Sequence, residues 1–246
     1  MQLTGQVALV TGVGDEGSLG FEIAKIFAAN DATVITSGRQ EERGQDIARL
    51  LDPTGTRVSF IQADLRDPKS AQALAASSGA VSILVNNAAA IAAGPTSELD
   101  VHGLDEMYAV NIRAPHILTG ALVPGMIAAG QGQIINISSI GAKLGTAGRA
   151  AYASTKAALE SLTRSWAVEF APHNVRVNAV APGPMHGPKM IRNAGEAGLR
   201  EIGKSIPLGR TVGPDEVAEA VLYLASDRAS YATGSVLALD GGRTVI

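Results

Sequence analysis

A tyrosine and a lysine lie four residues apart, at Tyr152 and Lys156, in a segment whose apolar pattern predicts a long helix. Residues at this spacing share one face of a helix. A phenol has an ordinary pKa near 10, and a neighbouring cation favours its ionised form; lowering that pKa by about 3 units requires about 4 kcal/mol. Tyr152 could then exchange a proton with a substrate oxygen, which Ser139 could orient by hydrogen bonding. Alone, the spacing also fits an exposed tyrosine beside a lysine extended along the helix surface.

A glycine-rich turn follows the first predicted strand, between Thr11 and Gly20, and leads into the first predicted helix. Glycines permit a close approach of the backbone, and a helix N-terminus offers free N–H groups and a positive dipole end to a pyrophosphate. The position of the turn therefore predicts a dinucleotide site. The alternative is an ordinary strand-to-helix turn that Ser18 caps. Asp15 and Glu16 would repel a phosphate and are expected to point outward.

The end of the second predicted strand distinguishes between the two nicotinamide dinucleotides. In dinucleotide-binding folds an acidic residue here bonds the ribose 2′-hydroxyl, whereas an arginine accommodates a 2′-phosphate. The strand ends at Gly38 and Arg39, and residues 33–40 contain no aspartate or glutamate. NADP(H) is therefore predicted over NAD(H). The alternative is that Arg39 is solvated or stacked on adenine.

Short apolar runs alternate with longer helical segments, and these elements must position the groups above. Strands are predicted at 7–10, 33–36, 58–61, 81–85, 134–137, 175–180 and 236–239, and helices at about 18–30, 42–51, from 68, 104–129, 150–171 and 214–225. The strands are continuous apolar runs, as expected when both faces of a parallel sheet are covered. The pattern predicts a doubly wound α/β fold, with one sheet of about seven parallel strands. Ser139 would then lie at the carboxyl edge of the sheet, where ligands bind.

Composition excludes several functional classes. The chain has 246 residues, a net charge of −3 and no cysteine, so neither a broad nucleic-acid surface nor a cysteine-ligated metal is predicted. The four histidines show no metal-ligand spacing. Residues 70–97 and 114–142 contain no Asp, Glu, Lys or Arg, but polar residues, glycine or proline interrupt them, and no membrane span is predicted. No signal peptide is recognised, and a reducing cytoplasm is the expected location.

The order and spacing of these motifs resemble the short-chain dehydrogenase/reductase family over nearly the whole chain. The matching pieces are the glycine turn at 11–20, Ala63-Asp64, Asn86-Asn87-Ala88-Ala89, Asn111, Ser139, Tyr152, Lys156, Pro182-Gly183 and Asp240-Gly241-Gly242. The resemblance implies a dinucleotide-dependent oxidoreductase with a Rossmann-like fold.

The family resemblance also implies a role for each matched residue. Asn111, Ser139, Tyr152 and Lys156 correspond to the family's catalytic tetrad, in which Asn111 holds a water that relays protons to Lys156. Lys156 would also bind the nicotinamide ribose. Cofactor contacts are implied at Gly12, Gly14, Ser18, Leu19, Gly20, Arg39, Asp64, Leu65, Asn87, Ala88, Tyr152, Lys156, Pro182 and Gly183, with Asp64 at the adenine and Pro182-Gly183 at the nicotinamide.

Two features depart from the usual pattern of the family. The glycine turn is two residues longer, and its Ser18-Leu19-Gly20 end resembles the enoyl-acyl-carrier-protein reductase branch, where a serine meets the pyrophosphate. That branch, however, spaces its tyrosine and lysine further apart than they are here. The second departure is Gly187, which stands where the family often has a threonine that holds the nicotinamide amide. Met185, His186 or a backbone group is the candidate replacement.

Together these observations predict an enzyme that moves a hydride between NADP(H) and a ketone or secondary alcohol, with Tyr152 as the general acid or base and without a metal. Two alternatives stay open: a non-catalytic dinucleotide sensor on the same fold, and an enoyl-thioester reductase. Residues 1–246 are predicted to form one domain, with an irregular, mobile substrate flap at about 184–208. The expected partner is a small carbonyl or alcohol, not nucleic acid or membrane, and the resemblance implies a homotetramer.

Overall fold

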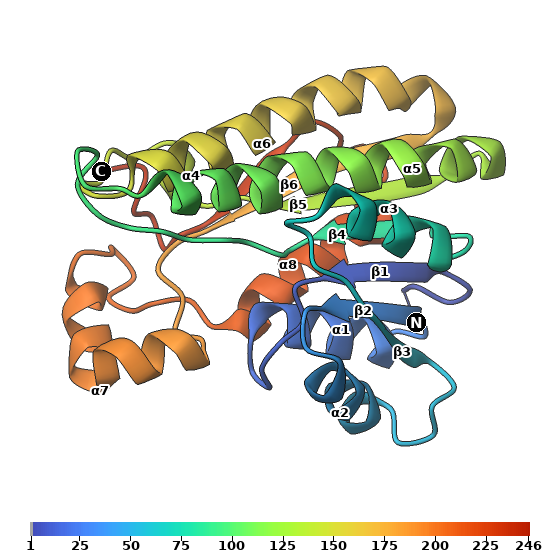
Figure 1. The fold of residues 1–246 in the computed structure, drawn as a ribbon, viewed down its shortest axis with the longest axis horizontal. Coiled ribbons are helices and arrows are strands. Elements are labelled where there is room, and N and C mark those ends of the chain that lie inside the picture. The colour runs from blue at the N-terminus through green and yellow to red at the C-terminus, as the bar shows by residue number, and fades with distance from the viewer. Residues whose placement is uncertain (1) are drawn as a thin grey trace.

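The computed structural model describes residues 2–246, and in this range it has one sheet of seven parallel strands (Figure 1). The strands are β1 (Val7–Thr11), β2 (Thr33–Gly38), β3 (Val58–Gln62), β4 (Ile83–Asn86), β5 (Gly132–Ile137), β6 (Val175–Pro182) and β7 (Val236–Leu239). Their order across the sheet is β3-β2-β1-β4-β5-β6-β7. The predicted doubly wound sheet is confirmed, and the direction in which strands are added reverses between β1 and β4.

Helices cover both faces of the sheet. They are α1 (Leu19–Ala29), α2 (Glu41–Leu51), α3 (Pro68–Ser77), α4 (Val101–Tyr108), α5 (Ala114–Ala129), α6 (Ala150–Phe170), α7 (Pro188–Lys204) and α8 (Pro214–Ala225), with the short turns η1 (Ala109–Arg113), η2 (Ile140–Ala142), η3 (Ala171–His173) and η4 (Asp227–Ala229). In Figure 1, α1, α2 and α8 lie below the sheet, and α3, α5 and α6 lie above it. Helix α7 lies apart from both layers, at the left of the view.

Neighbouring residues of the central strands face opposite helical layers, which explains their continuous apolar runs. In β1, Leu9 packs in the core with α3, α5 and α6, whereas Val10 packs in the core with α1 and α8. Leu84 and Val85 of β4 alternate in the same way, and all four side chains are fully buried. A parallel sheet covered on both faces needs this pattern. The two cores hold the carboxyl ends of the strands in place.

Helix α4, the π-turn η1 and α5 form one helical stretch over 101–129, which begins three residues earlier than predicted. Its length and its mean hydropathy of 1.2 would suffice to cross a membrane. However, Leu118, Leu122 and Met126 of its inner face pack in the core above the sheet. The stretch is therefore a core helix of this fold. The π-turn contains Asn111, and such turns often lie at functional sites.

The segment between β6 and α8 is mostly helical, so the prediction of an irregular segment there is wrong. Helix α7 occupies residues 188–204, and its backbone breaks at Gly195, where φ is 64°. Pro188 begins the helix, a position at which its missing N–H and fixed φ are favourable. Pro188 therefore marks the start of the helix and does not interrupt it. Whether the segment moves as a flap stays a prediction.

Candidate functional site

A cavity of about 1140 Å³ opens at the carboxyl edge of the sheet, beside the reversal between β1 and β4. Ligands of doubly wound folds bind at this place. The walls of the cavity come from the ends of β1, β2 and β3, the segment after β4, and α4. Six of the residues predicted to bind a cofactor line it: Gly12, Gly14, Arg39, Asp64, Leu65 and Ala88.

The glycine turn is fixed against the end of β4 by hydrogen bonds and by close backbone contact. The Thr11 hydroxyl accepts hydrogen bonds from the backbone N–H groups of Asn87 and Ala88, both at 3.1 Å. The side-chain amide of Asn87 donates to the Thr11 carbonyl at 2.8 Å. Gly12 has φ +74°, and a Cβ at this position would lie 2.5 Å from the Cα of Ala88. A Cβ at Gly20 would lie 2.8 Å from the Gly12 carbonyl oxygen. Both positions therefore require glycine.

The far end of the turn supports helix α1 and does not line the cavity. The Ser18 Oγ accepts a hydrogen bond from the backbone N–H of Phe21 at 3.4 Å and so caps the helix. Leu19 and Gly20 are buried, Leu19 in the core below the sheet. Gly14, in contrast, lines the cavity, and no atom of the described chain lies within 4 Å of the place where its Cβ would stand. A ligand can therefore approach the backbone closely at Gly14.

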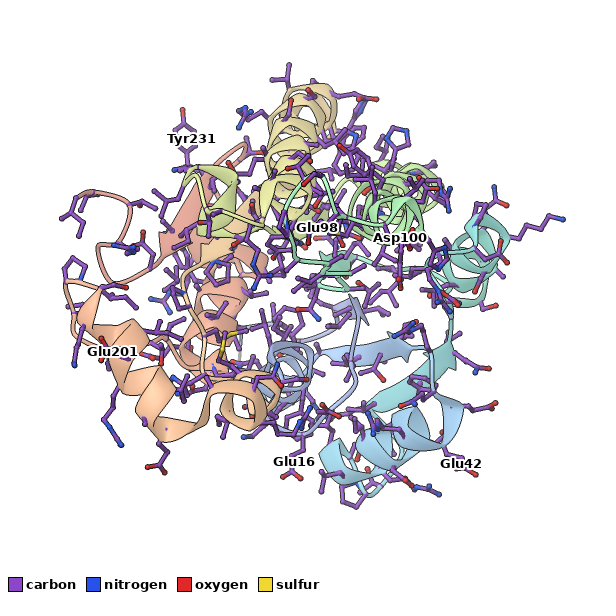
Figure 2. The ribbon with its side chains drawn as sticks, turned by 60° about the vertical axis from the view of Figure 1, so that its left-hand side comes forward. Glu16, Glu42, Glu98, Asp100, Glu201 and Tyr231 are labelled. Carbon is purple, nitrogen blue, oxygen red and sulfur yellow. The ribbon has the colours of Figure 1, made fainter. Side chains whose placement is uncertain are left out.

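The acidic residues of the turn do not line the cavity, but only one of them points freely into solvent. Glu16 is exposed and projects outward (Figure 2). The Asp15 carboxylate pairs with Arg43 of α2 at 2.9 Å and with Arg192 of α7 at 3.2 Å. Asp15 therefore ties the glycine turn to both helices.

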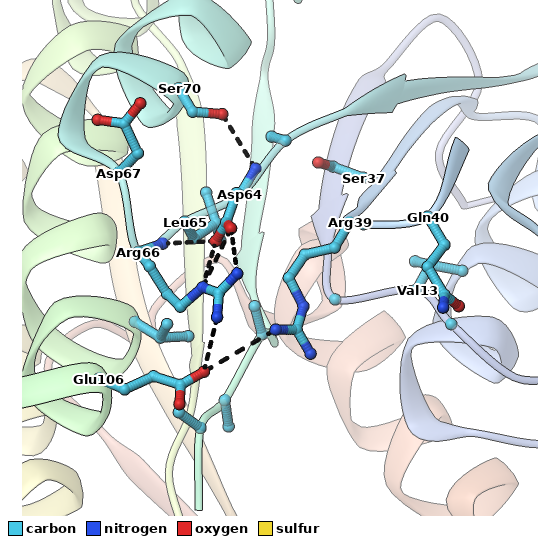
Figure 3. Close-up of a pocket in the computed structure, with 18 of the residues that line it drawn as sticks. Val13, Ser37, Arg39, Gln40, Asp64, Leu65, Arg66, Asp67, Ser70 and Glu106 are labelled. Carbon is cyan, nitrogen blue, oxygen red and sulfur yellow. Dashed lines mark hydrogen bonds and ion pairs between the residues drawn. The ribbon is translucent and has the colours of Figure 1, made fainter. Parts of the chain in front are cut away.

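Four charged side chains meet at the mouth of the cavity (Figure 3). The Nε of Arg66 lies 2.9 and 3.0 Å from the two carboxylate oxygens of Asp64. This hydrogen bonding lowers the pKa of Asp64. Glu106 of α4 faces both guanidinium groups, at 3.8 Å from Arg66 and 3.9 Å from Arg39. The carboxylate expected to meet adenine is therefore already engaged by a neighbouring arginine.

The sequence predicted Arg39 and Asp64 at this mouth but not Arg66 or Glu106. Arg66 follows the matched Ala63-Asp64 pair so closely that its proximity could have been noted. Glu106 carries no local signal, because only the packing of α4 brings it across the cavity from β2 and β3.

One buried hydroxyl also lines this cavity. Ser37, at the end of β2, is only 1% exposed, and among the described residues its Oγ has no hydrogen-bond partner. Buried polar groups in folded proteins nearly always have a partner. Ser37 is therefore available to a polar group of a ligand.

The residues predicted as a catalytic tetrad come from three elements and lie close together. Ser139 follows β5, Tyr152 and Lys156 share a face of α6, and Asn111 lies in η1. The Nζ of Lys156 is 5.7 Å from the centre of the Tyr152 ring and donates to the Ile137 carbonyl at 2.8 Å. The register of β4 with β5 ends one residue before Ile137, so no β4 residue lies opposite this carbonyl.

Burial controls the proton affinity of the tyrosine and the lysine. Desolvation raises the pKa of Tyr152, while a hydrogen bond with Ser139 and the charge of Arg149 oppose this effect. Desolvation lowers the pKa of Lys156 to about 8. The protein groups alone therefore raise the pKa of Tyr152, and a lowering by the ammonium together with the positive nicotinamide ring stays a prediction for the cofactor complex. The physical reason is that the burial of the phenol outweighs the nearby charges, while the ammonium bonds the Ile137 carbonyl.

The side chain of Asn111 is occupied by the protein itself. Its Oδ1 accepts from the backbone N–H of Ala90 at 2.8 Å, and its amide donates to the Ala90 carbonyl at 2.9 Å and to the Thr155 hydroxyl at 3.0 Å. Both amide hydrogens are therefore used. Asn111 joins the segment after β4, which lines the cavity, to the helix that carries Tyr152.

A buried polar network fixes β4, β5 and α6 in place beneath the tetrad. The Asn86 amide donates to Asn136 at 2.8 Å, and the Asn136 amide donates to the Thr163 hydroxyl at 2.8 Å. The Ser138 hydroxyl donates to the Glu160 carboxylate at 2.8 Å. The Asn86 Oδ1 has no partner among the described residues, but the hydrogen bonds that are made help to specify the positions of these elements.

Pro182 and Gly183 lie at the end of β6 and do not line the main cavity. The Gly183 N–H donates to the Leu239 carbonyl at 2.9 Å, and Gly183 lines a second cavity of about 510 Å³. Of the candidate replacements for the family's threonine, His186 is engaged elsewhere: its Nδ1 lies 3.0 Å from the Thr211 hydroxyl oxygen. Gly187 is the N-cap residue of α7.

The chain matches a protein-family profile over nearly its whole length. The profile described as Enoyl-(Acyl carrier protein) reductase matches residues 12–244. This range includes every residue that was predicted to take part in catalysis or cofactor binding.

Individual relatives match over the full length of the chain. A 2,5-dichloro-2,5-cyclohexadiene-1,4-diol dehydrogenase of Sphingobium indicum is 37% identical over 248 residues, covering 99% of this chain and 98% of that protein. A solved structure described as a short chain dehydrogenase/reductase family protein is 43% identical, has a TM-score of 0.92 and is covered completely, as is this chain. The solved structure of a gluconate 5-dehydrogenase of Burkholderia cenocepacia, in complex with NADP and tartrate, is 29% identical and has a TM-score of 0.92. The match covers 100% of this chain and 97% of that one.

Proposed function

Since the chain belongs to the short-chain dehydrogenase/reductase family, we propose that it transfers a hydride between NADP(H) and a ketone or secondary alcohol. The observation that carries this proposal is the meeting of Ser139, Tyr152 and Lys156, whose helix is joined through Asn111 to Ala90 in the wall of a cavity at the carboxyl edge of the sheet. Family membership makes the protein an NAD(P)-dependent oxidoreductase. The preference for the phosphorylated cofactor and the residue roles below belong to the proposal.

The cavity fits the adenosine half of such a cofactor. Its mouth offers the guanidinium groups of Arg39 and Arg66 to a phosphate, and the unpartnered hydroxyl of Ser37 lies in its wall. Gly12 and Gly14 give close access to the backbone at the N-terminal side of α1. The NADP bound to the Burkholderia relative agrees with this fit.

Tyr152 is the proton donor in the direction of ketone reduction. When bound, the cofactor supplies the hydride to the carbonyl carbon. The Tyr152 hydroxyl gives its proton to the carbonyl oxygen, and its raised pKa keeps that proton in place until the oxygen becomes basic. Ser139 orients the same oxygen, and the Lys156 ammonium stabilises the phenolate that remains. Alcohol oxidation uses the same groups in reverse.

Asn111 has a positioning role in this scheme. Its side chain holds Ala90 and Thr155, so it aligns the cavity wall with the helix of the proton donor. Because both amide hydrogens are bound, a water that relays protons toward Lys156 would donate either to the second lone pair of the Asn111 Oδ1 or to a backbone carbonyl of η1.

The substrate pocket is expected between three segments near the tetrad, at 90–98, 140–144 and 184–206. These segments are mainly apolar, which suits a small, largely uncharged carbonyl or alcohol. The Sphingobium relative, whose name gives a ring diol as its substrate, supports this substrate class. A homotetramer and a cytoplasmic location complete the proposal.

An enoyl-thioester reductase is the second candidate, because the profile that matches the chain carries that description. The four-residue spacing of Tyr152 and Lys156 and the diol dehydrogenase relative favour the ketone reaction. Reduction of an enone but not of the matched saturated ketone would select the enoyl reductase.

Substitution of Tyr152 by phenylalanine tests the proposal, because it removes the proton donor and keeps the ring. We expect turnover to fall by at least ~100-fold, the usual scale for loss of a general acid. Cofactor affinity, measured by fluorescence titration, should change little. Tyr231→Phe, which alters a fully exposed tyrosine (Figure 2), is the matched control. Undiminished turnover in Tyr152→Phe would refute the assignment, and tight cofactor binding without turnover in the wild type would indicate a sensor.

A further inference from the structure

Glu106 is a carboxylate at the mouth of a cavity to which we have assigned an anionic ligand. Its Oε1 lies 3.9 Å from Arg39 and 3.8 Å from Arg66, so one oxygen is shared by two guanidinium groups that follow the neighbouring strands β2 and β3 (Figure 3). Neither the family motifs nor the proposed reaction gives Glu106 a function.

The two arginines are held unequally. Arg66 also bonds Asp64, and its backbone carbonyl accepts from Arg113 at 2.5 Å. The Arg39 side chain is 61% exposed, and Glu106 is its one ion-pair partner among residues 2–246. Of Arg39, only the backbone is held by a hydrogen bond in the same range: its carbonyl oxygen accepts from the Gln62 side-chain amide at 2.9 Å. Arg39 can therefore leave Glu106 for another anion, whereas Arg66 stays beside Asp64.

We propose that Glu106 is a specificity-determining residue that competes with the 2′-phosphate of the cofactor for Arg39. This inference rests on the proposed function. A 2′-phosphate carries up to two negative charges and three acceptor oxygens, so it attracts Arg39 more strongly than a single carboxylate does. Binding of NADP(H) must nevertheless break the contact with Glu106 and bring the phosphate near its charge. A cofactor without the 2′-phosphate has no group to draw Arg39 away.

Glu106 therefore reduces the preference for NADP(H) that Arg39 would otherwise impose. Since the Glu106 side chain is 30% exposed and its contact with Arg39 is long, the competition is modest. Neutralising Glu106 should tighten binding of a 2′-phosphate about fivefold, the upper range for a partly exposed ion pair. The effect should shrink as salt is raised, because salt screens exposed charges.

Calorimetric titration with two adenosine fragments tests this competition without requiring turnover. Adenosine 2′,5′-bisphosphate carries the 2′-phosphate, and adenosine 5′-monophosphate lacks it. Glu106→Gln should lower the dissociation constant of the bisphosphate about fivefold and change that of the monophosphate less than twofold. Asp105→Asn removes the same charge from the neighbouring, exposed position of α4 and should leave both constants unchanged.

A double substitution separates competition for Arg39 from general repulsion. In the background of Arg39→Ala, Glu106→Gln should no longer improve binding of the bisphosphate. The inference would be overturned if Glu106→Gln still tightened bisphosphate binding by the full factor in that background, or if it tightened binding of both fragments equally. The proposed function would stay intact in either case. Failure of the wild-type protein to bind either fragment or NADPH would instead overturn the proposed function, and the inference with it.

Discussion

Lys156 must remain charged in a place that disfavours charge. Its side chain is 2% exposed, and burial lowers its pKa to about 8, against about 10.4 for a lysine in water. The hydrogen bond to the Ile137 carbonyl offsets part of this cost. At neutral pH the ammonium therefore persists beside Tyr152, but the protein is less stable than it would be with an uncharged group there.

The stability cost of this ammonium should depend on pH in a defined direction. Between pH 8 and about 10.5 the unfolded chain keeps the Lys156 proton and the folded chain loses it, so the contribution of this group to stability rises with pH. Relative to Lys156→Met, the wild type should therefore gain about 2 kcal/mol of unfolding free energy between pH 7 and pH 10. Urea denaturation at both values measures this. The exposed Lys25→Met should show no such trend, and a constant difference between wild type and Lys156→Met would contradict the prediction.

At the scale of the element, the glycine turn contains two kinds of glycine. Gly12→Ala would place a Cβ against the Ala88 backbone at positive φ, so we expect loss of several degrees of melting temperature or failure to fold. Gly14→Ala meets no described atom within 4 Å and should keep the wild-type melting temperature. If Gly14 faces the cofactor phosphates, Gly14→Ala should weaken NADPH binding by at least about tenfold. Thermal melts and cofactor titration distinguish the two, and equal melting of both variants would contradict this account.

Among the side chains that the structure describes, one ion pair joins helix α7 to the glycine turn. Arg192 bonds Asp15 at 3.2 Å, whereas Arg200 pairs only within α7, with Glu196. Arg192→Gln should therefore increase hydrogen exchange in 188–204 about two- to threefold, the scale of a partly exposed pair. Arg200→Gln serves as the control and should leave exchange near the turn unchanged. Identical exchange in the two variants would show that the ion pair does not hold α7.

Local sequence patterns predicted the sheet and the tetrad better than they predicted the mouth of the cavity. Strand ends and the helical spacing of Tyr152 and Lys156 are short-range signals, and they place these residues correctly along their elements. Helix α7 was not predicted, because Pro188 and three glycines within residues 188–204 weaken the local helical signal. Glu106 could not be predicted, because its partners depend on how α4 packs across the sheet. The same long-range packing buries Tyr152 and raises its pKa.

At the scale of the whole molecule, several apolar side chains remain exposed on one protomer. Val168 of α6 is 79% exposed, and Tyr108 of α4 and Leu237 of β7 are also exposed. Exposed apolar side chains on long helices and on an edge strand suit burial between protomers, so these elements are the expected interface of the proposed homotetramer. Light scattering after size exclusion should therefore give about four times the chain mass of 25.1 kDa. Val168→Asp, which buries a charge in such an interface, should lower the mass, whereas a wild-type monomer would refute the assembly.

Hydride transfer between NADP(H) and a ketone is tested by the consumption of NADPH and, separately, NADH by the purified protein with a panel of ketones, diketones and β-ketoacyl thioesters. We predict turnover of at least one ketone, with NADPH preferred. Turnover with NADH alone would keep the reaction and contradict the role given to Arg39. Absence of turnover with either cofactor, in both reaction directions, would contradict the claim itself.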